Sequence, residues 1–353
     1  MNAQQRAGRW LGSVLSDYLD RSVVLQLGGV FVEQPAMLDV SPVEPRPFWE
    51  ASRVADPRAV WVERSWETFD GRGWHEHELA GDSAGPGAHR GSRQLYATAH
   101  IGPRAAAAPL VVLLHGYAFP FTGFDRWIAW RLRRRGAHTV RLELPFHFRR
   151  AVPREHSGDH FFSLDPAHMR AVLRQSVEDT AAVVAWARRE VTPDVRLLGA
   201  SLGGLIGLLL SAQVPMDRTV AVAPLCDAPV SFTESRAGAM RRYMGMIGEA
   251  ARNWGADPAS VRDVLTESLA PIVPRRLRPV TPPERITIVE SVGDRIVGAE
   301  PMEELARAWG TQLWRYPHGH ITVMNAPGLP ERIVQHLAGP SGADSPDGVA
   351  LAG

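Results

Sequence analysis

One serine of this chain is flanked by small residues in a way that suits a nucleophile. Residues 195–207 read VRLLGASLGGLIG, an apolar strand that runs through Gly-Ala-Ser-Leu-Gly into a helix of small residues. A G-x-S-x-G turn between a strand and a helix is tight and strains the serine backbone, so its neighbours must be almost free of side chains. Gly199 and Gly203 meet that need, and the turn exposes the hydroxyl of Ser201. The five-residue pattern is weak on its own, so Ser201 needs partners elsewhere in the sequence.

An acid and a histidine follow Ser201 in the order that such a nucleophile requires. Residues 285–292 predict a β-branched strand that Asp294 follows, and residues 312–317 predict the next strand, which ends in His-Gly-His. The carboxyl ends of parallel strands meet at one edge of a sheet, so we expect these side chains beside Ser201. The histidine would accept the serine proton during attack, and the acid would fix its tautomer and stabilise the imidazolium.

Two of these assignments have alternatives. Gly-His at the end of the last strand favours His320 as the base, with His318 as the alternative. Asp294 is preferred as the acid, and Asp227, which follows the preceding strand, is the fallback. The competing interpretation of Asp294 is an ordinary turn aspartate.

Apolar strands alternate with helical segments over most of the chain. Strands are predicted near 110–114, 139–144, 195–200, 218–225, 285–292 and 312–317. Helices are predicted over 123–135, up to Gly136, and from Asp165, an N-cap followed by Pro166 at the first helical position. Before them, residues 60–66 and 93–99 predict antiparallel strands on either side of a glycine-rich loop. Helices between apolar strands imply a mostly parallel sheet with both faces covered.

Together, the serine turn, the Gly-Asp and Gly-His endings and the LLHGY segment at 113–117 resemble the α/β-hydrolase superfamily over about residues 58–338. Within it, LPFH at 144–147 with the following arginines, residues 158–163 and GHI at 319–321 are most similar to an abhydrolase domain-containing branch with an extended N-terminus. The resemblance implies an α/β-hydrolase fold with a helical lid insertion. It also implies an oxyanion hole built from the N–H groups of Leu202 and Tyr117, with His115 as a structural residue of the loop.

The chain is expected to have three parts: an extension over 1–57, a hydrolase domain over 58–338 with its lid at about 225–285, and a disordered tail over 339–353. Prolines at 42, 45 and 47 predict an extended connector. The apolar segment 23–32 is expected to pack on the core, with docking on a membrane or partner as the alternative. Methionines at 240–246 in the lid either line an acyl pocket or seat the lid on the core.

The composition excludes several classes of function. The formal charge is +1, so the overall balance implies neither a nucleic acid nor an anionic surface as partner. All basic residues are arginines, which rules out Schiff-base chemistry and a Ser–Lys dyad. Cys226 is the single cysteine, expected to be a buried, inert thiol. We find neither a signal-peptide core nor an integral membrane segment, and expect a cytoplasmic protein.

No cofactor or metal is expected. Histidines occur at 75 and 77 and at 147, 156, 160 and 168, but none of these spacings is typical of two metal ligands on a helix. His156 and His160 could share a helix face, yet Gly158 between them speaks against a helix. Phosphate-binding and dinucleotide-binding glycine motifs do not occur. Arg149, Arg150 and Arg154 either receive an anionic group of the substrate or are solvated loop charges.

These residues predict a serine hydrolase, carboxylesterase-like or lipase-like, that cleaves a carboxylic ester through an acyl-enzyme. Its partner would be a small-molecule acyl compound, with a lipid-like acyl group as one option. The alternatives are acyl transfer on the same triad and a non-catalytic hydrolase-fold module that binds a lipid or a partner.

Overall fold

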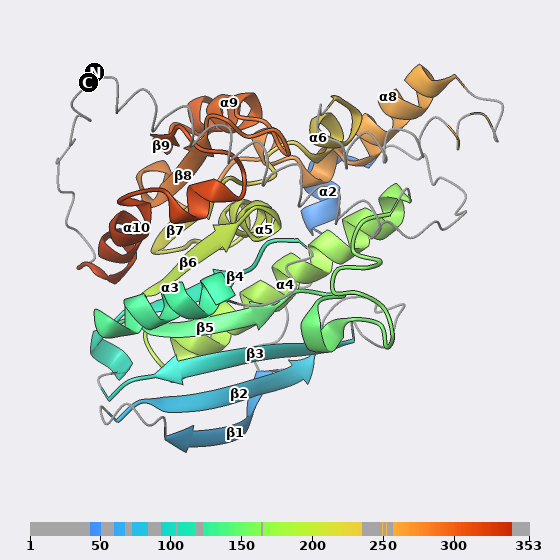
Figure 1. Ribbon diagram of the computed structural model, residues 1–353. Helices are drawn as coiled ribbons and strands as arrows, with labels where there is room; N and C mark the ends of the chain where they lie inside the picture. Colours follow the sequence, from blue (N-terminus) through green and yellow to red (C-terminus); the bar gives the residue numbers. More distant parts are fainter. Residues whose placement is uncertain are drawn as a thin grey trace, which may run out of the picture.

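A sheet of nine strands forms the centre of the part of the chain that the structure describes (Figure 1). The computed structural model describes residues 43–50, 60–67, 73–83, 93–103, 105–117, 123–163, 165–234, 249, 252 and 257–340. Three antiparallel strands form one edge: β1 (Val60–Glu67), β2 (His75–Asp82) and β3 (Gln94–Ile101). Six parallel strands follow in the spatial order β5 (His138–Glu143), β4 (Leu110–Leu114), β6 (Val195–Ala200), β7 (Arg218–Val222), β8 (Ile286–Ser291) and β9 (Gln312–Tyr316). The mostly parallel sheet expected from the sequence is confirmed.

Helices cover both faces of the parallel strands. On one face lie α4 (Pro166–Glu190), α5 (Leu202–Ser211) and α9 (Glu300–Trp309), and on the other lie α3 (Gly123–Arg134) and α10 (Leu329–Ala338). Alternate residues of β4 join the two core clusters, because successive side chains of a strand point to opposite faces. All five residues of β4 are buried for this reason.

Shorter elements lie in the connections. They are α2 (Pro45–Glu50), α6 (Ala228–Glu234), α8 (Pro258–Ser268) and the 3-10 turns η3 (Ala105–Ala107), η4 (Phe148–Arg150), η5 (Ala270–Ile272), η6 (Pro274–Arg276), η7 (Pro283–Arg285) and η8 (Thr322–Asn325).

Helix α4, which leads to the serine strand, begins where the sequence predicts. The carboxylate of Asp165 accepts the N–H of Ala167 at 2.9 Å, and Pro166 takes the first helical position. The end of α3 is also as expected, since Gly136 after it adopts a φ of +90°.

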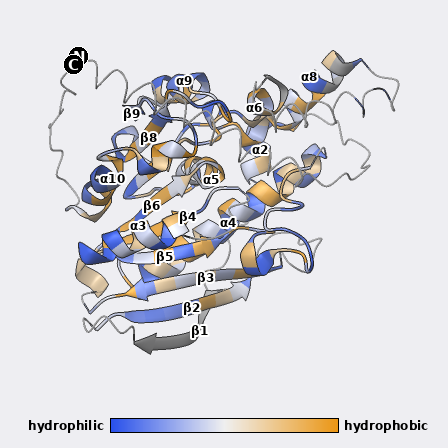
Figure 2. Cartoon of the chain, viewed as in Figure 1, coloured by the Kyte–Doolittle hydropathy of each residue, from blue (hydrophilic) through white to orange (hydrophobic). Residues whose placement is uncertain are grey.

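Strand β2 was not predicted. The sequence suggested a glycine-rich loop between 66 and 93, yet residues 75–82 pair with both β1 and β3. Four of its residues are His or Glu, and Figure 2 shows the strand as largely hydrophilic. Such residues give little strand signal, whereas pairing on both sides satisfies the backbone hydrogen bonds of β2 whatever its side chains.

The expected extended connector around the prolines is partly a helix. Pro45 opens α2, where a missing N–H costs nothing because the first turn has no acceptor for it. Phe48 and Trp49 of this helix are buried in the same core cluster as α4. The Trp49 indole donates to the carbonyl of Pro271 at 2.8 Å, so α2 packs against the turn that follows α8.

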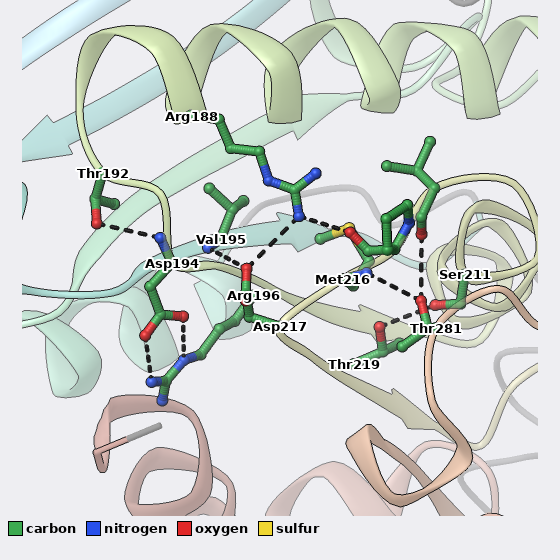
Figure 3. Close-up of polar contacts among 12 residues, drawn as sticks. Arg188, Thr192, Asp194, Val195, Arg196, Ser211, Met216, Asp217, Thr219 and Thr281 are labelled. Atoms are coloured by element: carbon green, nitrogen blue, oxygen red, sulfur yellow. Dashed lines mark hydrogen bonds and ion pairs between the residues drawn. The ribbon is translucent and has the colours of Figure 1, made fainter. Parts of the chain in front are cut away.

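A polar network (Figure 3) surrounds the start of β6, and Ser201 follows the other end of this strand. Arg196, which is almost fully buried, makes two bonds to the Asp194 carboxylate and donates to the carbonyls of Leu337 and Gly339. A cation at the end of a helix satisfies carbonyls that have no partner within it, so Arg196 holds the end of α10 against the sheet.

Several sequence-based predictions lie outside the described residues. They concern the apolar segment 23–32, the lid methionines at 240–246 and the tail beyond residue 340. Among the helices of the described ranges, none combines the length and the apolar character needed to cross a membrane.

Candidate active site

Ser201 occupies the turn between β6 and α5 with a φ of +51°, a conformation that residues with a side chain rarely adopt. Its N–H donates to the carbonyl of Val222 at 2.9 Å, which ties the turn to β7. A Cβ on Gly199 would lie 2.2 Å from the carbonyl oxygen of Gly203. A Cβ on Gly203 would lie 2.2 Å from that of Leu114. Strand, turn and helix therefore approach so closely that only glycine fits on either side of Ser201.

The structure brings Ser201, His320 and Asp294 together in one chain of hydrogen bonds. The Ser201 Oγ lies 2.9 Å from His320 Nε2, and His320 Nδ1 lies 2.6 Å from Asp294 Oδ2. Because a carboxylate can only accept, Nδ1 carries the proton and Nε2 is left to accept from the serine hydroxyl. His320 and Asp294 are both buried, while Ser201 is partly exposed. This is the geometry in which a histidine takes a proton from a serine.

The Asp294 carboxylate is held by the backbone of its own loop. Its second oxygen, Oδ1, accepts the N–H groups of Ile296 at 2.8 Å and Val297 at 2.9 Å. These two bonds leave Oδ2 directed at His320. Asp294 is thus a turn aspartate as well as the partner of the histidine, so the two interpretations of the sequence hold together.

The loop of the acid and the loop of the base are joined through the backbone of His318. Its carbonyl accepts the N–H of Gly293 at 2.9 Å and the hydroxyl of Ser291 at 2.6 Å. The imidazole of His318 is half-buried, which lowers its pKa. His318 therefore connects the two loops, while His320 meets Ser201.

Asp227, the alternative acid, lies at the start of α6. Its Oδ1 accepts the N–H of Val230 at 3.1 Å, and its other oxygen is 3.7 Å from the Arg275 guanidinium. Burial raises the pKa of Asp227, and the backbone bond and the arginine oppose that shift. The neighbouring Cys226 is a buried thiol whose pKa is raised by burial. Asp227 therefore caps a helix next to the site.

The histidine that follows β4 orients the backbone of its own loop. His115 Nε2 accepts the N–H of Leu144 at 3.1 Å, so its proton is on Nδ1, which donates to the Gly116 carbonyl at 2.8 Å. In a trans peptide the C=O and N–H point in opposite directions, so the N–H of Tyr117 points away from the His115 ring. Burial lowers the pKa of His115 to about 4, which keeps the ring neutral at neutral pH.

An aromatic cluster packs on this loop. The Tyr117 ring lies 4.7 Å from that of Phe162, and Phe162 lies 5.2 Å from Phe232 on α6. The His147 ring lies 4.8 Å from His115. Residues 146–162, which follow β5, therefore support the loop that carries Tyr117.

Two arginines in the loop after β5 contact other groups of the protein, while the third, Arg154, is exposed. Arg150 is fully buried, 2.9 Å from Asp179 Oδ2 on α4, and also donates to the Glu143 carbonyl at 2.9 Å. Arg149 binds the carboxylates of Glu143 and Glu78. Arg150 is therefore not a solvated loop charge, whereas Arg149 is exposed although it pairs with carboxylates of the protein itself. That these arginines receive an anionic group of the substrate stays a prediction. Asp179 was not predicted, and the available signal was an acidic residue among the apolar residues of a helix.

In the described ranges, no three His, Cys, Asp or Glu side chains come together in a group that could hold a metal ion. Two of the histidines with a possible metal role make other contacts. His160 contacts the carboxylate of Glu155, and His168 Nε2 lies 2.6 Å from the carbonyl of His160.

Comparison with known proteins finds similarity in structure alone. No family model and no curated protein matches the sequence. The structure resembles an acetyl xylan esterase from Paenibacillus sp. R4, with a TM-score of 0.59 and 14% identity, over 88% of this chain and 98% of that one. It also resembles acetyl xylan esterase 1 from Thermoanaerobacterium sp. JW/SL YS485, with a TM-score of 0.56 and 15% identity, over 84% of this chain and 92% of that one. A cold-adapted esterase from an Arctic intertidal metagenomic library gives a TM-score of 0.50 at 16% identity, over 78% of this chain and 99% of that one.

Structural similarity at such low sequence identity indicates a shared fold and nothing finer. The sheet order, the helices on both faces and the strained serine between β6 and α5 agree with it. The chain therefore has the α/β-hydrolase fold.

Proposed function

We propose that this protein is a serine hydrolase that cleaves carboxylic esters, with Ser201 as nucleophile, His320 as general base and Asp294 as the acid behind it. The observation that carries the proposal is the continuous hydrogen-bond chain from Ser201 Oγ through both nitrogens of His320 to Asp294 Oδ2. A serine hydroxyl is a poor nucleophile at neutral pH, and a histidine in this position removes that barrier.

In the first half-reaction, Ser201 Oγ attacks the ester carbonyl carbon while its proton passes to His320 Nε2. The imidazolium is stabilised by Asp294, which stays ionised. When the tetrahedral intermediate collapses, the bond to the alcohol oxygen breaks and that oxygen takes the proton from Nε2. The acyl group remains on Ser201. Water, losing its proton to the same nitrogen, then releases the acid and restores the serine.

The tetrahedral oxyanion needs two hydrogen-bond donors. We assign them to the N–H groups of Leu202, at the start of α5, and of Tyr117. The close approach of the backbone at Gly203 to Leu114 and His115 supports this pair, because it sets the first turn of α5 against the loop after β4. The N-terminus of α5 adds the favourable end of a helix dipole.

The class of substrate rests on the structural neighbours. The three structural neighbours reported above are named esterases, and two of them are acetyl xylan esterases. We take from them the ester bond alone, because the likeness is one of fold. The finer likeness to an abhydrolase domain-containing branch stays a prediction.

The test is labelling with a fluorophosphonate probe combined with hydrolysis of p-nitrophenyl acetate. We expect Ser201→Ala to lose both labelling and turnover while its circular dichroism and melting temperature stay close to those of the wild type. His320→Ala should lose turnover too, and His318→Ala, a change in the same loop, should keep it.

Turnover or labelling retained by Ser201→Ala would refute the proposal. Well-folded wild type that neither reacts with the probe nor hydrolyses any ester tested would favour the non-catalytic binding module instead.

A further inference from the structure

Helix α3 presents two tryptophans to solvent. Trp127 is 37% exposed and Trp130 is 46% exposed, while Ile128, Ala129 and Leu132 on the opposite side of the helix are buried. Within the described ranges the other exposed large hydrophobic residues are two valines far from this helix in the chain, Val280 and Val292. A helix packed on a sheet normally turns polar residues outward, so two large rings on its outer side are not explained by the fold.

Arginines surround these tryptophans. The helix carries four arginines against one aspartate, although the whole chain has a formal charge of only +1. Arg126 and Arg134 are exposed, and their spacing from Trp127 and Trp130 places all four on one face. The guanidinium of Arg134 lies 4.9 Å from the ring centre of Trp130. We call Arg126, Trp127, Trp130 and Arg134 the α3 face.

Other arginines at the border of this face are partly neutralised. Arg131 lies over the Trp127 ring, and both it and Arg135 pair with Glu331 on the adjacent helix α10. These contacts hold the border in place. The single carboxylate of Glu331 neutralises only one of the two guanidinium charges at this border. The outer side of α3 therefore keeps a positive charge.

The geometry points to an anionic lipid surface as the occupant of the α3 face. Trp rings settle at the interface between lipid headgroups and acyl chains, and arginines are attracted to anionic headgroups. A protein partner would need a contact of roughly 800 Å² on each side, with a well-packed centre. Two half-exposed rings on a convex helix offer far less, whereas a lipid surface can deform around them. We propose that the protein docks on anionic membranes through the α3 face.

Docking there would also orient the candidate active site. Helix α3 follows the loop after β4, so it begins at the carboxyl edge of the sheet, where Ser201 lies (Figure 1). The α3 face runs from the first turn of the helix, at Arg126, to its last residue, Arg134, so a membrane on it would lie along α3 and reach that edge at the start of the helix. The docking inference does not depend on the proposed ester hydrolysis, because none of the four residues belongs to the candidate active site.

The test is flotation of the full-length protein with phosphatidylcholine vesicles, with and without phosphatidylserine. Wild type should float with the anionic vesicles and be released by high salt. Arg126→Gln/Arg134→Gln should weaken the partition coefficient by about 10- to 30-fold, the equivalent of about 1 kcal/mol for each lost charge. Trp127→Ala/Trp130→Ala should weaken it by about tenfold.

Matched controls carry the same kinds of change elsewhere on the surface. Val280→Ala/Val292→Ala and Arg285→Gln/Arg307→Gln should float like wild type, since all four residues are exposed and lie outside α3. Hydrolysis of a soluble ester should be the same in every variant, which separates this inference from the proposed function.

Three outcomes would overturn the inference. Wild type that stays unbound with anionic vesicles would refute it, and so would α3 variants that float like wild type. A loss of binding in the control variants equal to that in the α3 variants would show that the α3 face is not responsible.

Discussion

At the scale of single residues, His115 shows how a buried ring can set the backbone of the loop after β4. Its two nitrogens are both used, one accepting from Leu144 and the other donating to the Gly116 carbonyl. The second bond turns the following N–H, that of Tyr117, away from the ring, and this N–H is the one assigned to the oxyanion hole. His115 is therefore a positioning residue in the proposed mechanism.

We expect His115→Phe to lower kcat by about 100-fold with little change in KM. Without the His115 bond the Tyr117 N–H is misplaced, and it then no longer stabilises the oxyanion that forms in the transition state. Asn at this position places an amide N–H near the former Nδ1, so His115→Asn should lose less kcat than His115→Phe. Steady-state kinetics on a soluble ester would check both. Equal kcat in the wild type and in folded His115→Phe would contradict the role.

A second prediction at this scale separates the two candidate acids. Asp294→Asn should lower kcat by roughly 10⁴-fold, because the amide stabilises neither the required tautomer nor the imidazolium. Asp227→Asn should leave kcat within a few-fold of wild type, since Asp227 caps α6. The comparison needs kcat for both variants under the same conditions. A large loss from Asp227→Asn alone would reverse the assignment.

At the scale of elements, the site depends on how closely β6, α5 and β4 approach each other. We expect Gly203→Ala to destabilise the protein by about 3 kcal/mol or more, because the new methyl would collide with the backbone of β4, which cannot move alone. Gly207→Ala is the matched change in the same helix. There the methyl would lie 2.5 Å from Leu197 Cδ2, the end of a flexible side chain.

Gly207→Ala should therefore cost less, since the side chain can turn away and alanine favours the helix. Urea denaturation of the two variants gives the comparison. Equal stability of the two would show that the approach of α5 to β4 is not as tight as described.

The segment after β5 is another element with an internal anchor, the buried pair of Arg150 and Asp179. Removing one partner leaves the other charge buried and unpaired, so Asp179→Leu should cost about 3–5 kcal/mol. The double variant Arg150→Met/Asp179→Leu should recover much of that loss, since neither charge then remains. Urea denaturation of the wild type and of the single and double variants measures the free energy of unfolding of each and so tests this. A double variant no more stable than Asp179→Leu would contradict the argument.

At the scale of the whole molecule, one buried and one partly buried histidine should make the fold sensitive to acid. Burial lowers the pKa of His115 to about 4 and that of His336 to about 4, and nearby arginines add to the shift at His336. The unfolded chain binds these protons from about pH 6.5 downward, whereas the folded protein binds them only near pH 4. Their contribution to stability is therefore full above pH 6.5 and is lost as the pH falls toward 4.

Each of the two histidines should reduce the free energy of unfolding by about 1.4 kcal/mol per pH unit across that interval. Urea denaturation at several pH values between 7 and 4.5 measures the slope. His336→Asn should lower this slope by the contribution of one histidine, about 1.4 kcal/mol per pH unit. An unchanged slope in that variant would show that His336 binds its proton equally in both states.

The sequence by itself determined the parts of the protein that depend on neighbours in the chain. Small residues around Ser201, an acid after one strand and a histidine after the next are local patterns, and the sheet brings them together because parallel strands end at the same edge. The cap at Asp165 and the left-handed Gly136 could be predicted for the same reason: each depends on a few consecutive residues.

Only the tertiary structure decided the features that depend on contacts distant in sequence. Strand β2 forms because it is paired on both sides, although its own residues predict a loop. Arg150 can be buried because it pairs with Asp179 of another element. Asp179 lies 29 positions later in the chain, so no local sequence pattern indicates that pairing. His320 rather than His318 meets Ser201 because the carbonyl of His318 is bound to the loop of Asp294, which turns the chain so that the second histidine faces the serine.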